Sequence, residues 1–492
     1  MAAAGLVVAT LLSLSVAVAS GADVKKSAPV FLLILLVLGW SRWWTRWRHL
    51  VALLLLIILF IPIKRYDLLV QLPFDLEPYR IFVAVLVMAW LGSLLLADPS
   101  IRLVKSGLEW PFFLIVGSAL CSIALNPERV DRVGSDVTKQ LTFFLSYFFV
   151  FYIIVSAVRT REALDYLIRF LVGGGAVIAV LAVVERRTGF NLFNHLSTFI
   201  PVLHFKGVNI AEDQQVRGGH LRVLGPSQHP IALSVLFVLL MPFAFYLARQ
   251  YGRGRWTVVA FLICLGTLST GSRTGIVGLL VLLLVYFVLQ PRAVRRLWPA
   301  LIPCVIATHF VVPGALGGVK AIFFPSGGLI ADQSGNVVGS KVTSASGRLA
   351  KIGPALGELS ADPVVGIGYG TRITTGSTAN APILDDQWLG TFVETGIIGV
   401  VAWVWLFVRA VRRQMRAARE TFDDDSWLFT GFAAATAAFG VSMLTYDAAS
   451  FIQTEFIFFI VLAFGAAFLN IHSAESPRRA EIVPVGSSGG RR

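Results

Sequence analysis

Long apolar runs recur along the whole chain, and this repetition constrains the fold more than any other feature of the sequence. Each run approaches the roughly 20 residues that a helix needs to cross the hydrocarbon core of a bilayer. Hydrophobic residues make up 56% of the chain and charged residues only 14%, unlike the balance of a soluble domain. Only helices and closed barrels satisfy their backbone polar groups in lipid. The runs therefore predict an all-α, polytopic integral membrane protein with about 12–14 transmembrane helices.

The runs also give the expected spans and a division of the chain. The expected spans are 4–20, 29–41, 50–63, 81–97, 109–125, 141–157, 164–184, 229–248, 256–270, 274–290, 297–312, 388–408, 427–445 and 452–469. The expected division is N-terminal transmembrane helices at 1–184, an outer loop at 185–228, core helices at 229–312, a large outer loop at 313–387, C-terminal helices at 388–470 and a cytoplasmic tail at 471–492. A signal sequence is the alternative for 4–20, but no basic segment precedes that run, so we expect a retained helix.

Lysine and arginine are concentrated in the loops that a cytoplasmic N-terminus would place inside the cell, as the positive-inside rule requires. The strongest basic segment lies at 409–419. The net charge of +14 therefore follows from membrane topology, and we expect no nucleic acid as a partner. Cys121, Cys264 and Cys304 lie inside or beside spans, and they predict packing roles without a disulfide or a zinc site.

Two arginines stand where outer helix ends meet the bilayer. Arg222 precedes the span at 229–248, and Arg273 lies in the hairpin Thr270-Gly271-Ser272-Arg273-Thr274-Gly275. The planar guanidinium fits phosphate oxygens, and the Ser272 hydroxyl with backbone N–H groups near a helix N-terminus adds further anion donors. The two arginines thus indicate a diphosphate site. The alternative is that both side chains reach toward the membrane interface without binding substrate.

The large outer loop carries two weaker signals. The spacing of Leu349, Ile352, Leu356 and Leu359 predicts a surface helix over 347–359, in which Arg348 and Lys351 bind either a phosphate or lipid head groups. The run Asp362-Pro363-Val364-Val365-Gly366-Ile367-Gly368-Tyr369-Gly370 predicts a sharp turn or a close backbone approach to a ligand, because glycine tolerates positive φ. No Rossmann strand precedes this run, which argues against nucleotide binding.

Asp385 and Asp386 stand at the border between this loop and the next apolar run. Charge near hydrocarbon is costly, so such a pair is a functional candidate. A carboxylate can act as a general base, and a second acid beside it raises the pKa of one member of the pair. The alternative role is a helix N-cap ahead of Trp388, and the two roles are compatible. His220 and His229, near Arg222, are alternative bases. The histidine spacing matches no metal site, and we expect no metal or other cofactor.

Taken together, these pieces resemble the O-antigen ligase and O-antigen polymerase superfamily of bacterial membrane glycosyltransferases. The matching elements, in chain order, are Arg222-x-x-Gly225-x-x-x-His229-Pro230, Thr270 to Gly275, Ser346-Gly347-Arg348-Leu349, Asp362 to Gly370, Asp385-Asp386-Gln387-Trp388-Leu389, and Glu394-Thr395-Gly396-Ile397-Ile398-Gly399. They cover roughly 220–405. No single element is specific, and the signal comes from their order and from their shared outer side.

The resemblance implies a GT-C-like, metal-independent, inverting enzyme in the bacterial cytoplasmic membrane, with its active site facing outward. Such an enzyme moves a glycan from a polyprenyl-diphosphate carrier to a hydroxyl of a glycan, lipid or protein acceptor, among other envelope polysaccharide machinery. The family's diphosphate-binding arginines match Arg222 and Arg273. Family members commonly carry His-Asn where this chain reads Asp385-Asp386, which leaves the identity of the base open.

Two other classes of function stay open. A lipid-linked oligosaccharide flippase has a similar number of spans, but the sequence lacks the two related halves that such transporters show. A non-catalytic envelope assembly protein is the third interpretation, favoured by the Asp385-Asp386 departure. Within the enzyme class, the missing histidine favours a polymerase over a ligase. The sugar and the acceptor are not predicted.

Overall fold

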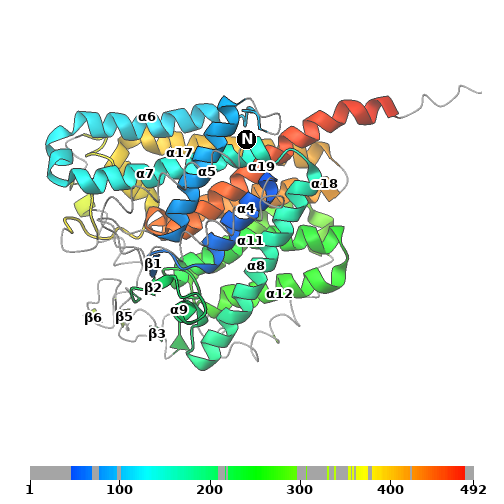
Figure 1. The fold of residues 1–492 in the computed structure, drawn as a ribbon, viewed down its shortest axis with the longest axis horizontal. Coiled ribbons are helices and arrows are strands. Elements are labelled where there is room, and N and C mark those ends of the chain that lie inside the picture. Colours follow the sequence, from blue (N-terminus) through cyan, green and yellow to red (C-terminus); the bar gives the residue numbers. More distant parts are fainter. Residues whose placement is uncertain are drawn as a thin grey trace, which may run out of the picture.

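The computed structural model describes residues 46–68, 77–96, 101–208, 216–217, 220–295, 306, 330–331, 337–338, 353–355, 357–358, 362–374, 379–421 and 424–482. The helices are α4 (Trp47–Phe60), α5 (Pro78–Leu95), α6 (Glu109–Leu125), α7 (Pro127–Ala157), α8 (Arg161–Thr188), α9 (Leu196–Phe199), α11 (Pro230–Gln250), α12 (Arg253–Ser269), α13 (Arg273–Leu289), α17 (Gln387–Glu420), α18 (Asp424–Ser442) and α19 (Ile452–Ile482), with 3-10 turns η1 (Leu192–Asn194), η2 (Met443–Thr445) and η3 (Ala448–Ser450). They form one bundle with its helices largely side by side (Figure 1).

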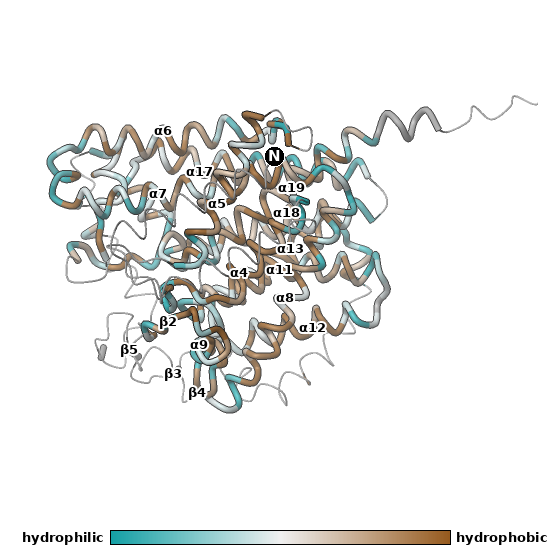
Figure 2. Tube along the Cα trace, in the orientation of Figure 1, coloured by the Kyte–Doolittle hydropathy of each residue, from teal (hydrophilic) through white to brown (hydrophobic). Residues whose placement is uncertain are grey.

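The described residues confirm the expected all-α polytopic class. Within them, seven helices are long and apolar enough to cross a membrane, namely α5, α7, α8, α11, α17, α18 and α19. The apolar helices α4, α6, α12 and α13 are shorter. Hydrophobic residues follow the helices, and hydrophilic residues gather where the helices turn (Figure 2). The expected spans 4–20 and 29–41, and all of 297–312 except residue 306, lie outside the described residues.

Three helices extend well beyond the apolar runs that predict them. α7 begins at Pro127 rather than near 141, because proline suits the first helical position and Glu128 complements the helix dipole there. α17 continues through its arginine-rich segment to Glu420, and α19 continues to Ile482. A run of apolar residues marks only the part of a helix that suits lipid. The helical hydrogen bonds of the backbone continue beyond that run into polar residues.

Strands are short and peripheral in the described part of the chain. β1 (Tyr66–Leu68) pairs with β2 (Leu203–Phe205), β3 (Val216–Arg217) with β4 (His220–Leu221), and β5 (Ile330–Ala331) with β6 (Val337–Val338), all antiparallel. The first pair places Tyr66 opposite Phe205. It therefore ties the end of α4 to the loop that follows α8.

Helix α11 occupies the centre of the bundle. Almost all of its side chains are buried, and it contacts α8, α12, α13, α18 and α19. Close approach to α13 depends on glycine: a Cβ at Gly275 would lie 2.8 Å from the Ser234 Cβ, and one at Gly278 would lie 2.9 Å from Val238. The starts of α11 and α13 are therefore held side by side.

The basic segments that the sequence predicts on the inner side of the membrane, such as 409–419, meet at one end of the bundle. Arg409 donates to the Gly107 carbonyl and Arg413 to that of Ser106, so the basic end of α17 packs against the turn before α6. Arg161 pairs with Asp425, and Arg249 lies 2.6 Å from Asp424. The starts of α11, α13, α17 and α19 lie at the opposite end. This arrangement agrees with the sidedness expected from the basic residues.

Helix α17 is broken at Gly396, where φ is +64° and ψ is −165°. The glycine-rich loop at 362–370 supplies the hydrogen bonds that the break leaves open: Ile367 N–H donates to the Val393 carbonyl and Ile397 N–H to the Pro363 carbonyl, both at 3.0 Å. A Cβ at Gly366 would lie 2.6 Å from the backbone carbonyl oxygen of Glu394. The close approach predicted for this loop is therefore made to the backbone of α17.

Helix α6 completes this junction. The Ser122 hydroxyl donates to the Glu394 carbonyl at 2.6 Å and accepts from Gly368 N–H at 3.1 Å. Asn126 donates to the Gly366 carbonyl at 3.0 Å. In lipid an unpaired backbone group is costly, so a broken membrane helix needs partners of this kind. The two motifs Asp362–Gly370 and Glu394–Gly399 are thus two halves of one structural unit.

Replacing Gly396 with alanine should destabilise the protein by at least about 1–2 kcal/mol, because φ is positive and the new Cβ would collide with the Val364 carbonyl. We expect a lower midpoint of thermal unfolding by tryptophan fluorescence in detergent. Gly117→Ala on α6 is the control, since a Cβ there meets no atom within 4 Å. Equal midpoints for the two variants would contradict the role given to the break.

Candidate functional site

The segment Met443–Phe451, called here the 443–451 link, joins α18 to α19 and contacts the other helix starts at its end of the bundle. The Thr445 hydroxyl donates to that of Thr274, in the first turn of α13, at 2.8 Å. The Gln387 N–H donates to the Tyr446 carbonyl at 3.2 Å, and the Gln387 side-chain oxygen accepts from the Ala449 N–H at 2.7 Å. The link therefore holds the starts of α13 and α17 together.

The start of α11 reaches the same link through aromatic packing. The His229 ring lies 5.7 Å from the Phe451 ring, and Phe451 stacks on Tyr446 at 5.8 Å, between centroids. His229 also caps α11, because its Nδ1 accepts from the Ile231 N–H at 3.1 Å. One ring nitrogen of this histidine is thus occupied by the helix.

The two predicted arginines come from segments that lie side by side. Arg222 is buried, with 8% of its surface exposed. A Cβ at Gly271 would lie 3.8 Å from Arg222 Cγ, so the side chain runs along the hairpin between α12 and α13. Gly271 has φ +60°, which the tight hairpin requires, and Arg273 begins α13 directly after it. The structure therefore joins two sequence motifs about 50 residues apart, Arg222 and the Arg273 hairpin, at one place.

Two buried charged residues hold the loop that carries Arg222. Arg65, at the end of the α4 turn, donates to the Gly225 carbonyl at 2.9 Å and to the Ser227 carbonyl. Glu185, on α8, accepts from the N–H groups of Leu224 at 3.1 Å and Gly225 at 2.9 Å. Burial lowers the pKa of Arg65 to about 10, with Glu185 opposing the shift, so Arg65 stays cationic at neutral pH.

Three buried polar atoms in the segments that meet here have no hydrogen-bond partner among the described residues. They are the side-chain oxygen of Gln228 and the hydroxyls of Ser272 and Tyr446. Gln228 precedes His229, Ser272 precedes Arg273, and Tyr446 belongs to the 443–451 link. A buried polar atom left unpaired costs about 1–3 kcal/mol, so three of them in adjoining segments indicate a place where a polar ligand binds.

The two predicted aspartates have different surroundings. Asp386 is the N-cap of α17, and its Oδ1 accepts from the N–H groups of Trp388 at 2.9 Å and Leu389 at 3.2 Å. The capping alternative for this residue is therefore observed. Asp385 is buried, with 8% of its surface exposed, and has φ +54°. Strained backbone of this kind, in a residue with a side chain, is concentrated at functional sites.

Asp447, in the 443–451 link, is a third carboxylate at this place and was not predicted. Burial and the nearby Asp385 raise its pKa, whereas a hydrogen bond from Ser450 and the cations Arg372 and Lys64 oppose the rise. The Ser450 hydroxyl donates to Asp447 at 2.6 Å. A lone acid in the short segment between the spans 427–445 and 452–469 is the sequence signal that could have found it.

Arg372 was also missed, and it is buried near Asp447. Its Nε donates to Glu358 at 3.2 Å, and its Nη2 donates to the Pro382 carbonyl at 3.2 Å. These contacts connect the loop after Gly370 to the segment that leads into Asp385. Arg372 therefore adds a positive charge that acts on Asp447.

The remaining predicted residues are placed as follows. His220 begins β4, opposite Arg217 in register. Arg348 and Lys351 lie outside the described residues, and the surface helix expected over 347–359 is represented only by helical residues at 353–355 and 357–358. In the part of the chain that the structure describes, no three His, Cys, Asp or Glu residues are grouped to hold a metal ion.

Residues 257–404 match the family described as O-antigen ligase. This part of the chain is similar to that family. The match confirms the relation to the O-antigen ligase and polymerase superfamily, and at a general level it supports a ligase-like or glycosyltransferase-like enzyme of envelope polysaccharide assembly. No curated protein matches the chain. The matched region contains Arg273 and Asp385, whereas Arg222 and Asp447 lie outside it.

The cap and the charge of Asp386 can be separated by two substitutions. Asp386→Ala should lower the free energy of unfolding by about 1 kcal/mol, whereas Asp386→Asn should leave it nearly unchanged, because asparagine caps as well as aspartate. Thermal unfolding of both variants in detergent measures this difference. Equal destabilisation by alanine and asparagine would show that the negative charge, not the cap, stabilises the start of α17.

Proposed function

We propose that this membrane protein is an enzyme that transfers a glycan from a polyprenyl-diphosphate donor to an acceptor hydroxyl. The transfer takes place at the outer face of the cytoplasmic membrane. The observation that carries this proposal is the meeting of Arg222, the Arg273 hairpin and Asp385 around the 443–451 link. The link thus connects the helix starts that carry cations suited to a diphosphate with those that carry carboxylates suited to a hydroxyl, and we infer that a lipid-linked substrate enters from the bilayer at this end of the bundle.

The diphosphate is assigned to Arg222 and Arg273. The bond between the anomeric carbon and the diphosphate oxygen breaks, and the electron pair stays with the diphosphate. Arginines already held in place stabilise that developing charge without reorganisation. Arg65 and Glu185 support this role by fixing the loop after Arg222. The buried Ser272 hydroxyl, at the start of α13, adds a donor to the same oxygens.

The acceptor hydroxyl is assigned to Asp385, with Asp447 as its coupled partner. The hydroxyl oxygen attacks the anomeric carbon from the face opposite the diphosphate, its proton passes to the carboxylate, and the configuration inverts. Asp386 is less suited to this step because Oδ1 is engaged by the helix. His220 and His229 stay alternative bases. This scheme uses fixed cations in place of a divalent metal.

Replacing either Arg222 or Arg273 with alanine should lower glycan transfer by about 10²–10³-fold, the usual effect of losing a charge-stabilising donor. Arg273→Lys should also fail, because a point charge does not replace the forked guanidinium. The assay measures transfer from a polyprenyl-diphosphate oligosaccharide in proteoliposomes. Arg416→Ala is the control, since Arg416 pairs with Glu420 on the exposed opposite end of α17.

Full activity of both alanine variants would overturn the diphosphate assignment. A wild-type protein that moves the lipid-linked donor across the bilayer without forming product would instead support the flippase alternative. Unchanged activity in EDTA is expected, and a strict requirement for a divalent ion would contradict the metal-independent scheme.

The pH dependence tests the coupled carboxylates. Both carboxylates must be deprotonated, so kcat/KM should fall in acid, and because the pKa of Asp447 is raised the midpoint should lie above the ordinary aspartate pKa of about 3.9. Asp447→Asn should reduce transfer and move the midpoint of the residual activity to lower pH, because Asp447, the carboxylate whose pKa is raised, no longer titrates. Glu128→Gln, at the exposed start of α7, is the control. An unchanged midpoint in Asp447→Asn would contradict the coupling.

A further inference from the structure

Gln453, in the first turn of α19, is a buried polar residue that the proposed function does not yet use. Only 1% of its surface is exposed, and Phe456 and Ile457 in the next turn of the helix are buried apolar residues. A buried amide is costly unless its polar groups are hydrogen-bonded, so the partners of this side chain indicate its role. It lies two residues after the end of the 443–451 link.

One side of the Gln453 amide completes the end of α4. Its Nε2 donates to the Ile58 carbonyl at 2.8 Å. In a continuing helix that carbonyl would accept from the N–H of residue 62, but residue 62 is proline and has no N–H. The amide therefore replaces a hydrogen bond that the sequence of α4 cannot make, and it holds α19 against the end of α4.

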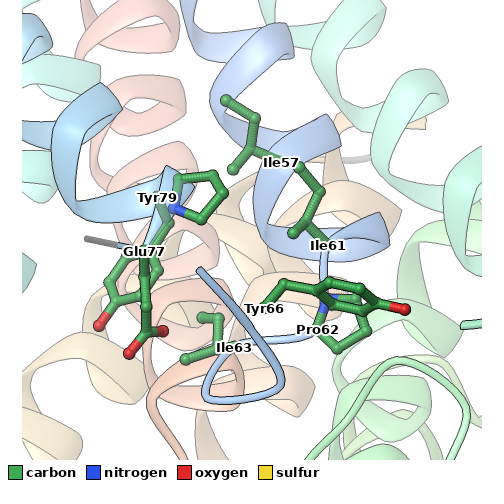
Figure 3. Close-up of a pocket in the computed structure, with 8 residues that line it drawn as sticks. Ile57, Ile61, Pro62, Ile63, Tyr66, Glu77 and Tyr79 are labelled. Atoms are coloured by element: carbon green, nitrogen blue, oxygen red, sulfur yellow. The ribbon is translucent and has the colours of Figure 1, made fainter. Parts of the chain in front are cut away.

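The end of α4 is itself held in place by its neighbours. An apolar pocket separates it from the start of α5, with Ile57, Ile61, Pro62 and Tyr66 on one side and Glu77 and Tyr79 on the other (Figure 3). The Tyr66 hydroxyl donates to the Phe193 carbonyl at 2.9 Å, and the Tyr79 ring lies 5.7 Å from the Phe456 ring of α19, between centroids. The end of α4 is therefore a fixed partner for Gln453.

The other side of the amide holds the loop that carries Arg222. The Ser227 hydroxyl donates to Gln453 Oε1 at 2.6 Å. Ser227 is fully buried, its N–H donates to the Leu224 carbonyl at 3.0 Å, and its carbonyl accepts from Arg65. All three polar groups of Ser227 are thus paired, and the bond from its side chain connects the loop to α19.

The start of α19 contacts the start of α11 at a second point. Two residues before Gln453, the Phe451 ring packs against the ring of His229. Gln228, whose buried side-chain oxygen has no partner among the described residues, lies between the two contacts in the sequence. The two contacts together fix the position of the loop that carries Arg222 relative to the 443–451 link.

We propose that Gln453 is a positioning residue for the diphosphate site, because through Ser227 it fixes the loop that carries Arg222 against the 443–451 link. In this scheme Gln453 touches no substrate. Its assignment rests on the proposed function, since the group that it positions is the guanidinium that receives the diphosphate. Without this amide the loop loses its hydrogen bond to α19, and Arg222 binds the diphosphate less tightly.

Equilibrium binding of radiolabelled geranylgeranyl diphosphate to the full-length protein in phosphatidylcholine nanodiscs tests this assignment. Gln453→Met removes both hydrogen bonds at nearly constant volume, whereas Ser227→Ala removes only the bond to the loop. Each should raise the dissociation constant about tenfold. Gln414→Met is the matched control, because Gln414 is a buried glutamine in the basic half of α17, at the opposite end of the bundle, and should leave binding unchanged.

The same variants in an Arg222→Gln background separate positioning from general support of the fold. If Gln453 acts through Arg222, adding Gln453→Met to Arg222→Gln should weaken binding no further, because no guanidinium is left to position. A general loss of packing would weaken binding by the same factor in both backgrounds. A smaller folded fraction lowers the number of binding sites and leaves the dissociation constant of the folded protein unchanged.

Two results would overturn the positioning role while the wild type still binds the diphosphate. They are unchanged dissociation constants in Gln453→Met and Ser227→Ala, and equal effects of either variant with and without Arg222→Gln. A wild type that does not bind the diphosphate would overturn the proposed function and this assignment together. If Gln453→Met does not fold, Ser227→Ala in the two backgrounds decides the question, since it removes a single hydroxyl.

Discussion

Backbone hydrogen bonding at the break in α17 is the constraint on which the rest of the site depends. A membrane helix can leave its regular path only where protein atoms replace the lost hydrogen bonds, and the loop at 362–370 with Ser122 and Asn126 does this around Gly396. The break separates the first turns of α17, capped by Asp386, from the long membrane segment that follows. Those first turns can then meet the 443–451 link, which places Asp385 near Asp447.

Fixed backbone contacts also position the arginines on the other side of the link. The loop after Arg222 is fixed between Arg65 and Glu185, and the hairpin before Arg273 is fixed by close packing of Gly275 on α11. Side chains that are positioned before substrate arrives lose little entropy when it binds, and they need not reorganise as charge develops. The buried, unpaired oxygens at Gln228, Ser272 and Tyr446 are the structural sign that a polar ligand belongs between these supports.

The sequence predicted what depends on composition and local pattern. Apolar runs gave the helix class, and polar residues at their ends gave Arg222, Arg273, Asp385 and the capping alternative for Asp386. Contacts between segments that are distant in the chain could not be predicted from the sequence. The glycines of 362–370 suggested a ligand cradle because their true partner, the backbone at Gly396, is a tertiary neighbour. Asp447, Arg65 and Gln453 were missed for the same reason, since each is ordinary in its own segment and becomes informative only beside its partners.

The central claim is that the helix starts around the 443–451 link form the binding site of a lipid-linked diphosphate. A structure of the protein in lipid nanodiscs with a bound polyprenyl diphosphate tests it most directly. We expect the two phosphates to lie between Arg222 and Arg273, with the lipid chain leaving toward the bilayer and Asp385 on the side of the anomeric position. Phosphates bound away from both arginines, or a lipid lying in a passage through the bundle, would contradict the account.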